Sequence, residues 1–265
     1  MTKEAEDEID QRYMVPGLSR GLALLQLFTR ERQAQSLAEL AAGLALSRSA
    51  AYRLVYTLEK ERFLARDPAT RRYRLTSKVL TLGFDYLHAQ GIIEQAQPFL
   101  RALSDKTRAA SYVIILDGWE SVYLARIAPP AVGLVSNLQV GMRLPAHVTA
   151  SGRILLAHLS EDELREVYRR LQRECKAVPP PASFAELKAQ AEADRRRGYV
   201  YSASLFGPGS FSMACAVRDS SGRAVAAVNV LGPQALFDQL GGETVLRGQV
   251  GEAIGALSER LGFTG

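Results

Sequence analysis

Apolar residues in the first part of the chain recur every three to four positions, which is the period of an amphipathic helix. This spacing predicts a helix over 18–29. Ser36 and Glu39 have the spacing of a capping box, so a second helix is expected to begin at Ser36. Ser47 resembles a further N-cap, and it opens a predicted third helix over 48–61. The stripe that this third helix would bury consists of Ala51, Leu54, Val55 and Leu58.

The opposite face of the third helix is polar and basic. Hydroxyl donors and guanidinium groups near a helix N-terminus are the groups that read base edges in the major groove of DNA. The pattern therefore predicts a helix-turn-helix that binds DNA. The residues expected to contact DNA here are the two caps, Ser36 and Ser47, and the exposed Arg48, Ser49, Tyr52, Arg53 and Tyr56.

The segment after the third helix alternates in the manner of a β-hairpin. Two short strands, 63–66 and 71–75, flank a turn that contains Pro68. A hairpin in this position is the wing of a winged helix-turn-helix. Its arginines, Arg71, Arg72 and Arg74, suit contacts with phosphate groups.

The distribution of charge agrees with a DNA-binding N-terminal domain. The whole chain has a formal net charge of +5 and a sequence pI near 9.3. Counted along the sequence, residues 15–80 carry +7, residues 1–14 carry −3, and residues 81–265 carry +1. The excess of positive charge thus lies on the predicted DNA-binding segment. The alternative is a basic face that is merely solvated.

The remaining pattern divides the chain into four parts. We expect an acidic disordered tail over 1–14, a winged helix-turn-helix over 15–76, and a linker helix over 77–91. The rest, 92–265, is expected to form a separate C-terminal domain. It opens with a helix over 92–107 that Pro98 interrupts.

From residue 112 onward the apolar period changes from helical to strand-like. A hairpin over 112–127 has an Asp117-Gly118 turn, and a second strand pair spans 212–217 and 224–231. The predicted helices between and after these strands span 161–172 and 184–197 and include a final helix with Leu246, Val250, Ile254, Leu257 and Leu261. Helices that flank mostly antiparallel strands define an α+β domain.

A helix that begins at Thr149 is the best candidate for a small-molecule site. The first backbone N–H groups of a helix lack partners and attract a carboxylate. The segment Thr149-Ala150-Ser151-Gly152-Arg153 adds two hydroxyls and a glycine that permits close approach, with Arg143 and His147 nearby. The alternative is an ordinary capped helix whose small residues pack tightly.

Strand residues are expected to enclose the body of the ligand. Asn229 interrupts an apolar strand, and a buried amide must find hydrogen-bond partners. A ligand is one such partner, and the backbone or water is another. On the opposing strand, Met213 and Cys215 alternate on one side and would form either pocket wall or plain core.

Other classes of protein find less support in the sequence. The two cysteines, Cys175 and Cys215, form no C-x-x-C motif, which favours a reducing cytoplasm. No apolar run has the length of a membrane span, and no histidine–cysteine cluster has metal spacing. No cofactor is expected. An enzyme on an α+β fold remains an alternative, as does an architectural DNA-binding protein without a ligand.

Ordered motifs along nearly the whole chain resemble the IclR family of bacterial transcriptional regulators. They begin with Leu18-Ser19-Arg20-Gly21-Leu22, Ser36 to Ala41, Leu46 to Leu54 and Leu75 to Gly83, and they continue with Gly141 to Pro145, Thr149 to Arg153, Gly198-Tyr199 and Asn229 to Pro233.

The segments 76–98 and 141–157 are most similar to the branch that controls protocatechuate, 4-hydroxybenzoate and β-ketoadipate catabolism. The resemblance implies a winged helix-turn-helix, a linker helix and a GAF-like effector domain, working as a homodimer or a dimer of dimers. It further implies a regulator of a catabolic operon that binds operator DNA and a small organic acid, with an aromatic carboxylate as the expected effector.

Two departures from the family pattern bear on these expectations. The family usually has Gly in the turn before the recognition helix, where this chain has Ala45, so the turn is expected to be built differently. After Gly198-Tyr199 the family usually has acidic residues, where this chain has Ser202 and Ser204. Those two serines fall beside the expected effector pocket, so the identity of the effector does not carry over from the branch.

Overall fold

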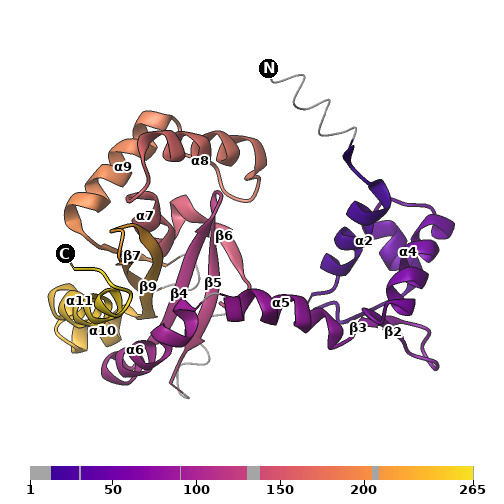
Figure 1. The fold of residues 1–265 in the computed structure, drawn as a ribbon, viewed down its shortest axis with the longest axis horizontal. Helices are drawn as coiled ribbons and strands as arrows, with labels where there is room; N and C mark the ends of the chain where they lie inside the picture. The colour runs from indigo at the N-terminus through magenta and orange to yellow at the C-terminus, as the bar shows by residue number, and fades with distance from the viewer. Residues whose placement is uncertain (1–12, 30, 90, 130–137, 205–208, 265) are drawn as a thin grey trace. The chain divides into compact units, whose positions relative to one another are not determined.

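The protein divides into two compact units, Met1–Ala89 and Gln90–Gly265. The structure is a computed structural model that describes residues 13–29, 31–89, 91–129, 138–204 and 209–264 (Figure 1). Most of the predicted acidic tail, 1–12, therefore lies outside the described residues.

The first unit contains the three predicted helices around a small apolar core. They are α2 (Pro16–Gln26), α3 (Leu37–Gly43) and α4 (Arg48–Lys60). Leu24, Leu40 and Val55, one from each helix, are fully buried. A sheet in the order β1-β3-β2 completes the unit, with strands β1 (Ala34–Gln35), β2 (Leu64–Arg66) and β3 (Tyr73–Leu75). The predicted wing is the β2–β3 hairpin.

The turn between α3 and α4 contains one residue in the left-handed backbone conformation, and that residue is an alanine and not a glycine. Ala45 has a φ of 52°, and the N–H of Leu46 donates to the carbonyl of Ala41 at 2.9 Å. A left-handed conformation costs an L-residue with a side chain roughly 1–2 kcal/mol. The chain therefore carries strain at Ala45, where glycine would carry none, and the turn itself is closed by a hydrogen bond.

The helix α5 (Lys78–Ala89) ends the first unit and corresponds to the predicted linker helix. Its start is fixed to the wing region, because the Lys78 ammonium donates to the carbonyl of Glu61 at 2.7 Å and lies over the ring of Phe63. Beyond this point the helix exposes large apolar side chains, among them Leu80, Leu82 and Tyr86. The side chain of Leu87 lies outside the described residues.

The second unit is built on an antiparallel sheet in the order β6-β5-β4-β9-β8-β7. The two central pairs match the two predicted hairpins, with longer strands than the apolar pattern indicated. The strands are β4 (Ala110–Asp117), β5 (Glu120–Ile127), β6 (Arg143–Pro145), β7 (Val200–Ala203), β8 (Ser210–Arg218) and β9 (Ala224–Pro233).

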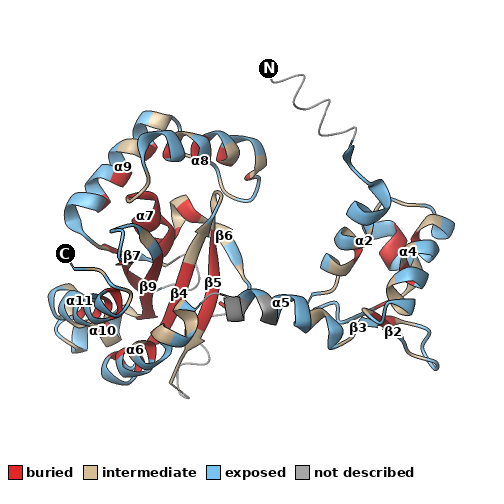
Figure 2. Cartoon of the chain, in the orientation of Figure 1, coloured by how far each residue is buried: buried red, intermediate tan, exposed pale blue. Residues whose placement is uncertain are grey.

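Helices cover both faces of this sheet (Figures 1 and 2). α6 (Ile92–Thr107) and α11 (Gly242–Arg260) pack on one face, where the Ser111 hydroxyl of β4 donates to the carbonyl of Leu100 at 2.8 Å. The short α7 (Ala150–Leu156) packs on the other face against Tyr112 and Ala214. The remaining helical segments are η2 (Ala146–Val148), α8 (Glu161–Glu174), α9 (Phe184–Arg197) and α10 (Gln234–Gln239).

Two edge strands, β6 and β7, were not predicted. Each has at most four residues, and in β7 only Val200 is fully buried, so neither shows an alternating apolar pattern. β7 also follows directly on the left-handed Gly198 that ends α9. It brings Ser202 and Ser204 to the edge of the sheet beside β8.

Gly152 fixes how closely α7 approaches η2. A Cβ atom at this position would lie 2.2 Å from the carbonyl oxygen of Ala146 and 2.5 Å from the Ser121 hydroxyl. Real contacts of this kind are not that short, so α7 is seated where only glycine fits.

We predict that Gly152→Ala destabilises the second unit by about 3 kcal/mol, because the obstructing atoms belong largely to the backbone and cannot rotate away. Urea denaturation measures the change. Gly255→Ala on α11 is the matched control: no heavy atom lies within 4 Å of its added Cβ, so it is expected to be neutral or to stabilise by about 0.5–1 kcal/mol. Equal denaturation midpoints for Gly152→Ala and the wild type would contradict the close contact.

Candidate functional site

The polar face of α4 is exposed as the sequence indicated. Arg48, Ser49 and Arg53 are exposed, and the rings of Tyr52 and Tyr56 are about half exposed, at 49% and 48%, with their centroids 6.2 Å apart. The helix begins at Ser47, whose hydroxyl accepts from the N–H of Ala50. The arrangement presents guanidinium, hydroxyl and phenol groups along one side of a helix, which is the chemistry that reads base edges.

Ser36 caps α3, and both its hydroxyl and its backbone N–H are used in this cap. Its hydroxyl accepts from the N–H of Glu39, while its own N–H donates to the Glu39 carboxylate at 2.7 Å. These hydrogen bonds, and then the Arg72 guanidinium, lower the pKa of Glu39 to about 2. The Glu39 carboxylate is therefore negatively charged at neutral pH.

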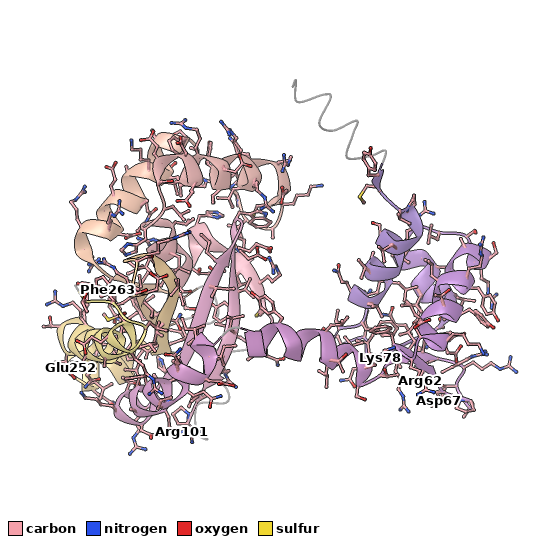
Figure 3. The ribbon with its side chains drawn as sticks, viewed as in Figure 1. Arg62, Asp67, Lys78, Arg101, Glu252 and Phe263 are labelled. Atoms are coloured by element: carbon pink, nitrogen blue, oxygen red, sulfur yellow. The ribbon has the colours of Figure 1, made fainter. Side chains whose placement is uncertain are left out.

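Arg72, one of the residues expected to contact phosphate, holds the wing to the helix-turn-helix. Its guanidinium donates to both carboxylate oxygens of Glu39, at 2.9 and 2.8 Å, and to the carbonyl of Ala34 at 3.0 Å. Arg71 and Arg74 are exposed. In the loop between β2 and β3, Asp67 accepts from two backbone N–H groups and so shapes the tip of the wing (Figure 3).

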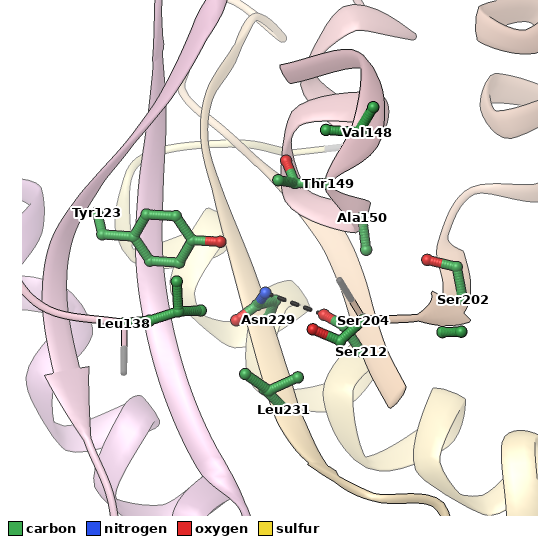
Figure 4. A pocket seen from close by; sticks show the side chains of 11 residues that line it. Tyr123, Leu138, Val148, Thr149, Ala150, Ser202, Ser204, Ser212, Asn229 and Leu231 are labelled. Atoms are coloured by element: carbon green, nitrogen blue, oxygen red, sulfur yellow. Dashed lines mark hydrogen bonds between the residues drawn. The ribbon is translucent and has the colours of Figure 1, made fainter. Parts of the chain in front are cut away.

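A pocket opens in the second unit between the start of α7, the edge strand β7 and the α7 side of the sheet (Figure 4). Its cavity volume is about 20 Å³, roughly the space of one water molecule. The described residues that line it include no Asp, Glu, Lys or Arg. They are Tyr123, Leu138, Val148, Thr149, Ala150, Ser202, Ala203, Ser204, Ser212, Asn229 and Leu231.

Asn229 is the polar group in this pocket that most needs a partner. Its side chain is 3% exposed, and its amide nitrogen donates to the Ser212 hydroxyl at 3.1 Å. Its amide oxygen, Oδ1, is buried and accepts no hydrogen bond within the described residues. A buried acceptor without a donor is costly, so a ligand or water that donates here would be stabilised.

Thr149 lines the pocket but uses its hydroxyl to build it. The Oγ1 atom accepts from the N–H of Gly152 at 3.0 Å and shares a hydrogen bond with the Ser121 hydroxyl at 3.0 Å. Opposite, burial raises the pKa of Tyr123 to about 12, an effect that the neighbouring Ser151 hydroxyl reduces. Tyr123 is therefore a neutral phenol at physiological pH. All the lining side chains are thus uncharged.

Four residues expected near the ligand do not line the pocket. Arg143 is on the edge strand β6, paired with Asp117 at 2.6 Å and with Glu120 at 2.8 Å. The Nε2 atom of His147 hydrogen-bonds to the Pro179 carbonyl, and burial lowers the pKa of this imidazole. Gly152 packs against the backbone of η2, so this glycine makes room for η2 and not for a ligand. Ser151 is fully buried and outside the lining.

Met213 and Cys215 face away from the pocket, contrary to the expectation. Ala214 is directly opposite Asn229 in the β8–β9 pair, and opposite residues in a sheet point to the same face. Ser212 therefore shares the face of Asn229, while Met213 and Cys215 face the α11 side. Burial raises the pKa of the Cys215 thiol to about 12, so it behaves as an inert core residue.

Sequence reasoning missed Tyr123 and Ser212, together with four small or apolar lining residues. Only the register between strands decides which alternate residues of β5 and β8 face inward, and single-strand alternation cannot supply it. Ser212 has no distinct signal, because β8 also contains Ser210 two positions earlier. The four others are Leu138, Val148, Ala203 and Leu231.

Together, a winged helix-turn-helix with an exposed polar helix face and a separate unit with a small, uncharged pocket are the parts expected of a ligand-responsive DNA-binding protein. Comparison with known families agrees. Residues 17–68 match the IclR helix-turn-helix domain, and residues 84–259 match the C-terminal domain of the bacterial transcriptional regulator IclR. The chain belongs to the IclR family of transcriptional regulators.

Individual relatives extend this result. The chain is 33% identical over 213 residues to the Pca regulon regulatory protein of Pseudomonas putida, covering 80% of this chain and 72% of that protein. It is 29% identical to the p-hydroxybenzoate hydroxylase transcriptional activator of Acinetobacter baylyi, covering 89% and 90%. A solved structure of a proposed transcriptional regulator from Rhodococcus sp. RHA1 is 34% identical in sequence and has a TM-score of 0.75. The match covers 94% of this chain and 98% of that chain.

Two further features of the described residues limit the chemistry. None of their helices is both long and apolar enough to cross a membrane. No group of three or more histidine, cysteine or acidic residues among them could hold a metal ion.

Proposed function

We propose that this regulator senses a small aromatic hydroxy acid and thereby controls genes for the breakdown of aromatic acids. The single observation that carries the proposal is the buried Oδ1 of Asn229, which has no hydrogen-bond partner within the described residues and lies in a pocket lined by uncharged side chains. An architectural DNA-binding protein would have no use for such a group. The names of the relatives, a Pca regulon regulator and a p-hydroxybenzoate hydroxylase activator, support the aromatic class.

The two ends of the ligand would meet different groups. Because no basic side chain lines the pocket, the carboxylate would depend on backbone donors at the start of α7 and on hydroxyls. The N–H of Gly152 is already taken by Thr149, which leaves the N–H groups of Ala150 and Ser151. A ring hydroxyl would donate to Asn229, and Ser212 has a hydroxyl proton to donate in return.

We predict that 4-hydroxybenzoate binds about tenfold more tightly than either benzoate or 4-hydroxybenzamide, since each analogue lacks one of the two hydrogen-bonded ends. Calorimetry measures the three affinities. In Asn229→Leu the preference over benzoate should vanish, whereas Cys215→Ala, on the opposite face of the sheet, should leave it unchanged. Equal affinity for the acid and its amide, or an unaltered preference in Asn229→Leu, contradicts this binding mode.

Ligand binding becomes regulation only if it changes DNA binding. The two affinities must be coupled, and the coupling is reciprocal. Footprinting the DNA upstream of the chain's own gene, with and without 4-hydroxybenzoate, identifies the operator and measures this coupling. Binding of the acid with no change in operator affinity would reject the proposed function.

We further propose a division of labour on DNA between α4 and the wing. Arg53→Ala should cost about 1–3 kcal/mol on the operator and relax specificity, because a guanidinium that reads a base is lost. Arg71→Ala should weaken binding to all sequences alike and flatten the salt dependence, as expected for a phosphate contact. Titrations over a range of salt on operator and random DNA measure both, and an unchanged specificity ratio in Arg53→Ala would show that α4 is not the reading helix.

The active form is proposed to be a homodimer or a dimer of dimers. One helix-turn-helix contacts too few base pairs for tight binding at physiological salt, so two half-sites are expected. In the first unit an apolar groove of about 410 Å³ runs between α2, α4 and α5. Beside it Leu22 is 53% exposed and Leu80 is 56% exposed, so this face has the character of a surface that a second copy covers.

We predict that Leu22→Glu shifts the protein toward the monomer and weakens operator binding. A charge on an apolar interface must be desolvated, which opposes association. Sedimentation at micromolar concentration measures the change, with Val225→Glu in the second unit as the control for an added surface charge. A wild-type protein that sediments as a monomer with and without operator would overturn the dimer.

A further inference from the structure

An ion pair behind the pocket joins α7 to α9. The Arg153 guanidinium donates to both carboxylate oxygens of Asp194, with Nε at 3.0 Å from Oδ2 and Nη2 at 2.8 Å from Oδ1. The side chains are 24% and 7% exposed. Gln190, one turn earlier on α9, lies against the same guanidinium. A two-pronged contact of this type fixes both distance and orientation.

This pair leaves Arg153 unavailable to a ligand. An arginine one turn into α7 would be the obvious receptor for a carboxylate, yet its guanidinium is turned toward α9 and neutralised there. Apolar side chains could have joined two helices at no desolvation penalty, whereas a buried pair is costly to assemble. What the pair provides that apolar contacts do not is a defined geometry.

The two helices that it joins carry opposite walls of the pocket. α7 begins with Thr149 and Ala150, which line one wall. α9 ends at Gly198 and continues into β7, which supplies Ser202 and, just beyond it, Ser204 to the other wall. α7 packs against both α9 and β7, and Gly152 already seats it on η2. The ion pair is therefore placed to set the separation of the walls.

We propose that the Arg153–Asp194 pair is a positioning device for effector binding: it holds the start of α7 and the strand β7 at the separation that the effector requires. The proposal rests on the effector site described above. Neither residue touches the ligand. Breaking the pair therefore reduces effector affinity and the effector response, while binding of DNA in the absence of effector is retained.

The test compares full-length variants by calorimetry with 4-hydroxybenzoate and by amide hydrogen exchange. In Asp194→Asn, binding should weaken by roughly tenfold or more, since misplaced walls lose several contacts at once. Exchange should quicken at 148–152 and at 200–204 but not in α8 or α11. Asp194→Glu keeps the carboxylate and should retain most of the affinity. Lys188→Gln breaks an exposed pair between α9 and α8 and should match the wild type.

Two outcomes would overturn the proposal. One is wild-type affinity and wild-type exchange in Asp194→Asn; the other is faster exchange spread evenly over the whole unit, which denotes general loss of stability. If Asp194→Asn fails to fold, the double variant Arg153→Met, Asp194→Leu removes both charges together. Wild-type effector affinity in this double variant would show that apolar packing replaces the ion pair, and it would contradict the positioning role. If the wild type binds no aromatic acid, the proposed effector is wrong, and the exchange pattern still decides the role of the pair.

Discussion

The contact of α7 with η2 through Gly152 is the constraint on which the proposed effector pocket depends. It brings the cap residue Thr149 into hydrogen-bonding range of Ser121 on β5, so the start of a helix is tied directly to the sheet. With that end fixed, Ala150 belongs to the apolar core and also lines the pocket together with Asn229. A seven-residue helix contributes little stability of its own, so its position is set by this packing.

In the first unit, a single carboxylate has two structural roles. Glu39 belongs to the capping box of α3, and it also receives the Arg72 guanidinium from the wing. One carboxylate thus sets the start of the helix-turn-helix and the attachment of the hairpin. Because its pKa is lowered to about 2 from a usual 4.5, the stability it provides is fully present above pH 4.5 and is lost only as the pH falls through 2.

Most of the secondary structure could be predicted from the sequence, because caps and apolar periods are local signals. Ser36, Ser47 and Thr149 each cap the helix that the pattern indicated. The face of the sheet on which each strand residue lies was harder to predict. Cys215 was a candidate for the pocket wall, but it lies on the other face of β8. Its face follows from the pairing of Ala214 with Asn229, which are distant in sequence. β7 was missed because a four-residue edge strand with one buried apolar residue has no local signature.

Three basic residues near the two candidate sites are paired within the protein, which sequence motifs alone do not reveal. Arg72, Arg143 and Arg153 each stand where a basic side chain was plausible for phosphate or carboxylate, and each is engaged by an acidic residue remote in sequence. An arginine that satisfies its donors within the protein offers a ligand little. The described residues that line the proposed effector pocket are uncharged, so any selectivity of this pocket would come from the positions of its hydrogen-bonding groups. Those positions are set by the packing of α7, β7 and β9, and the register of the β8–β9 pair decides which side chains face the pocket.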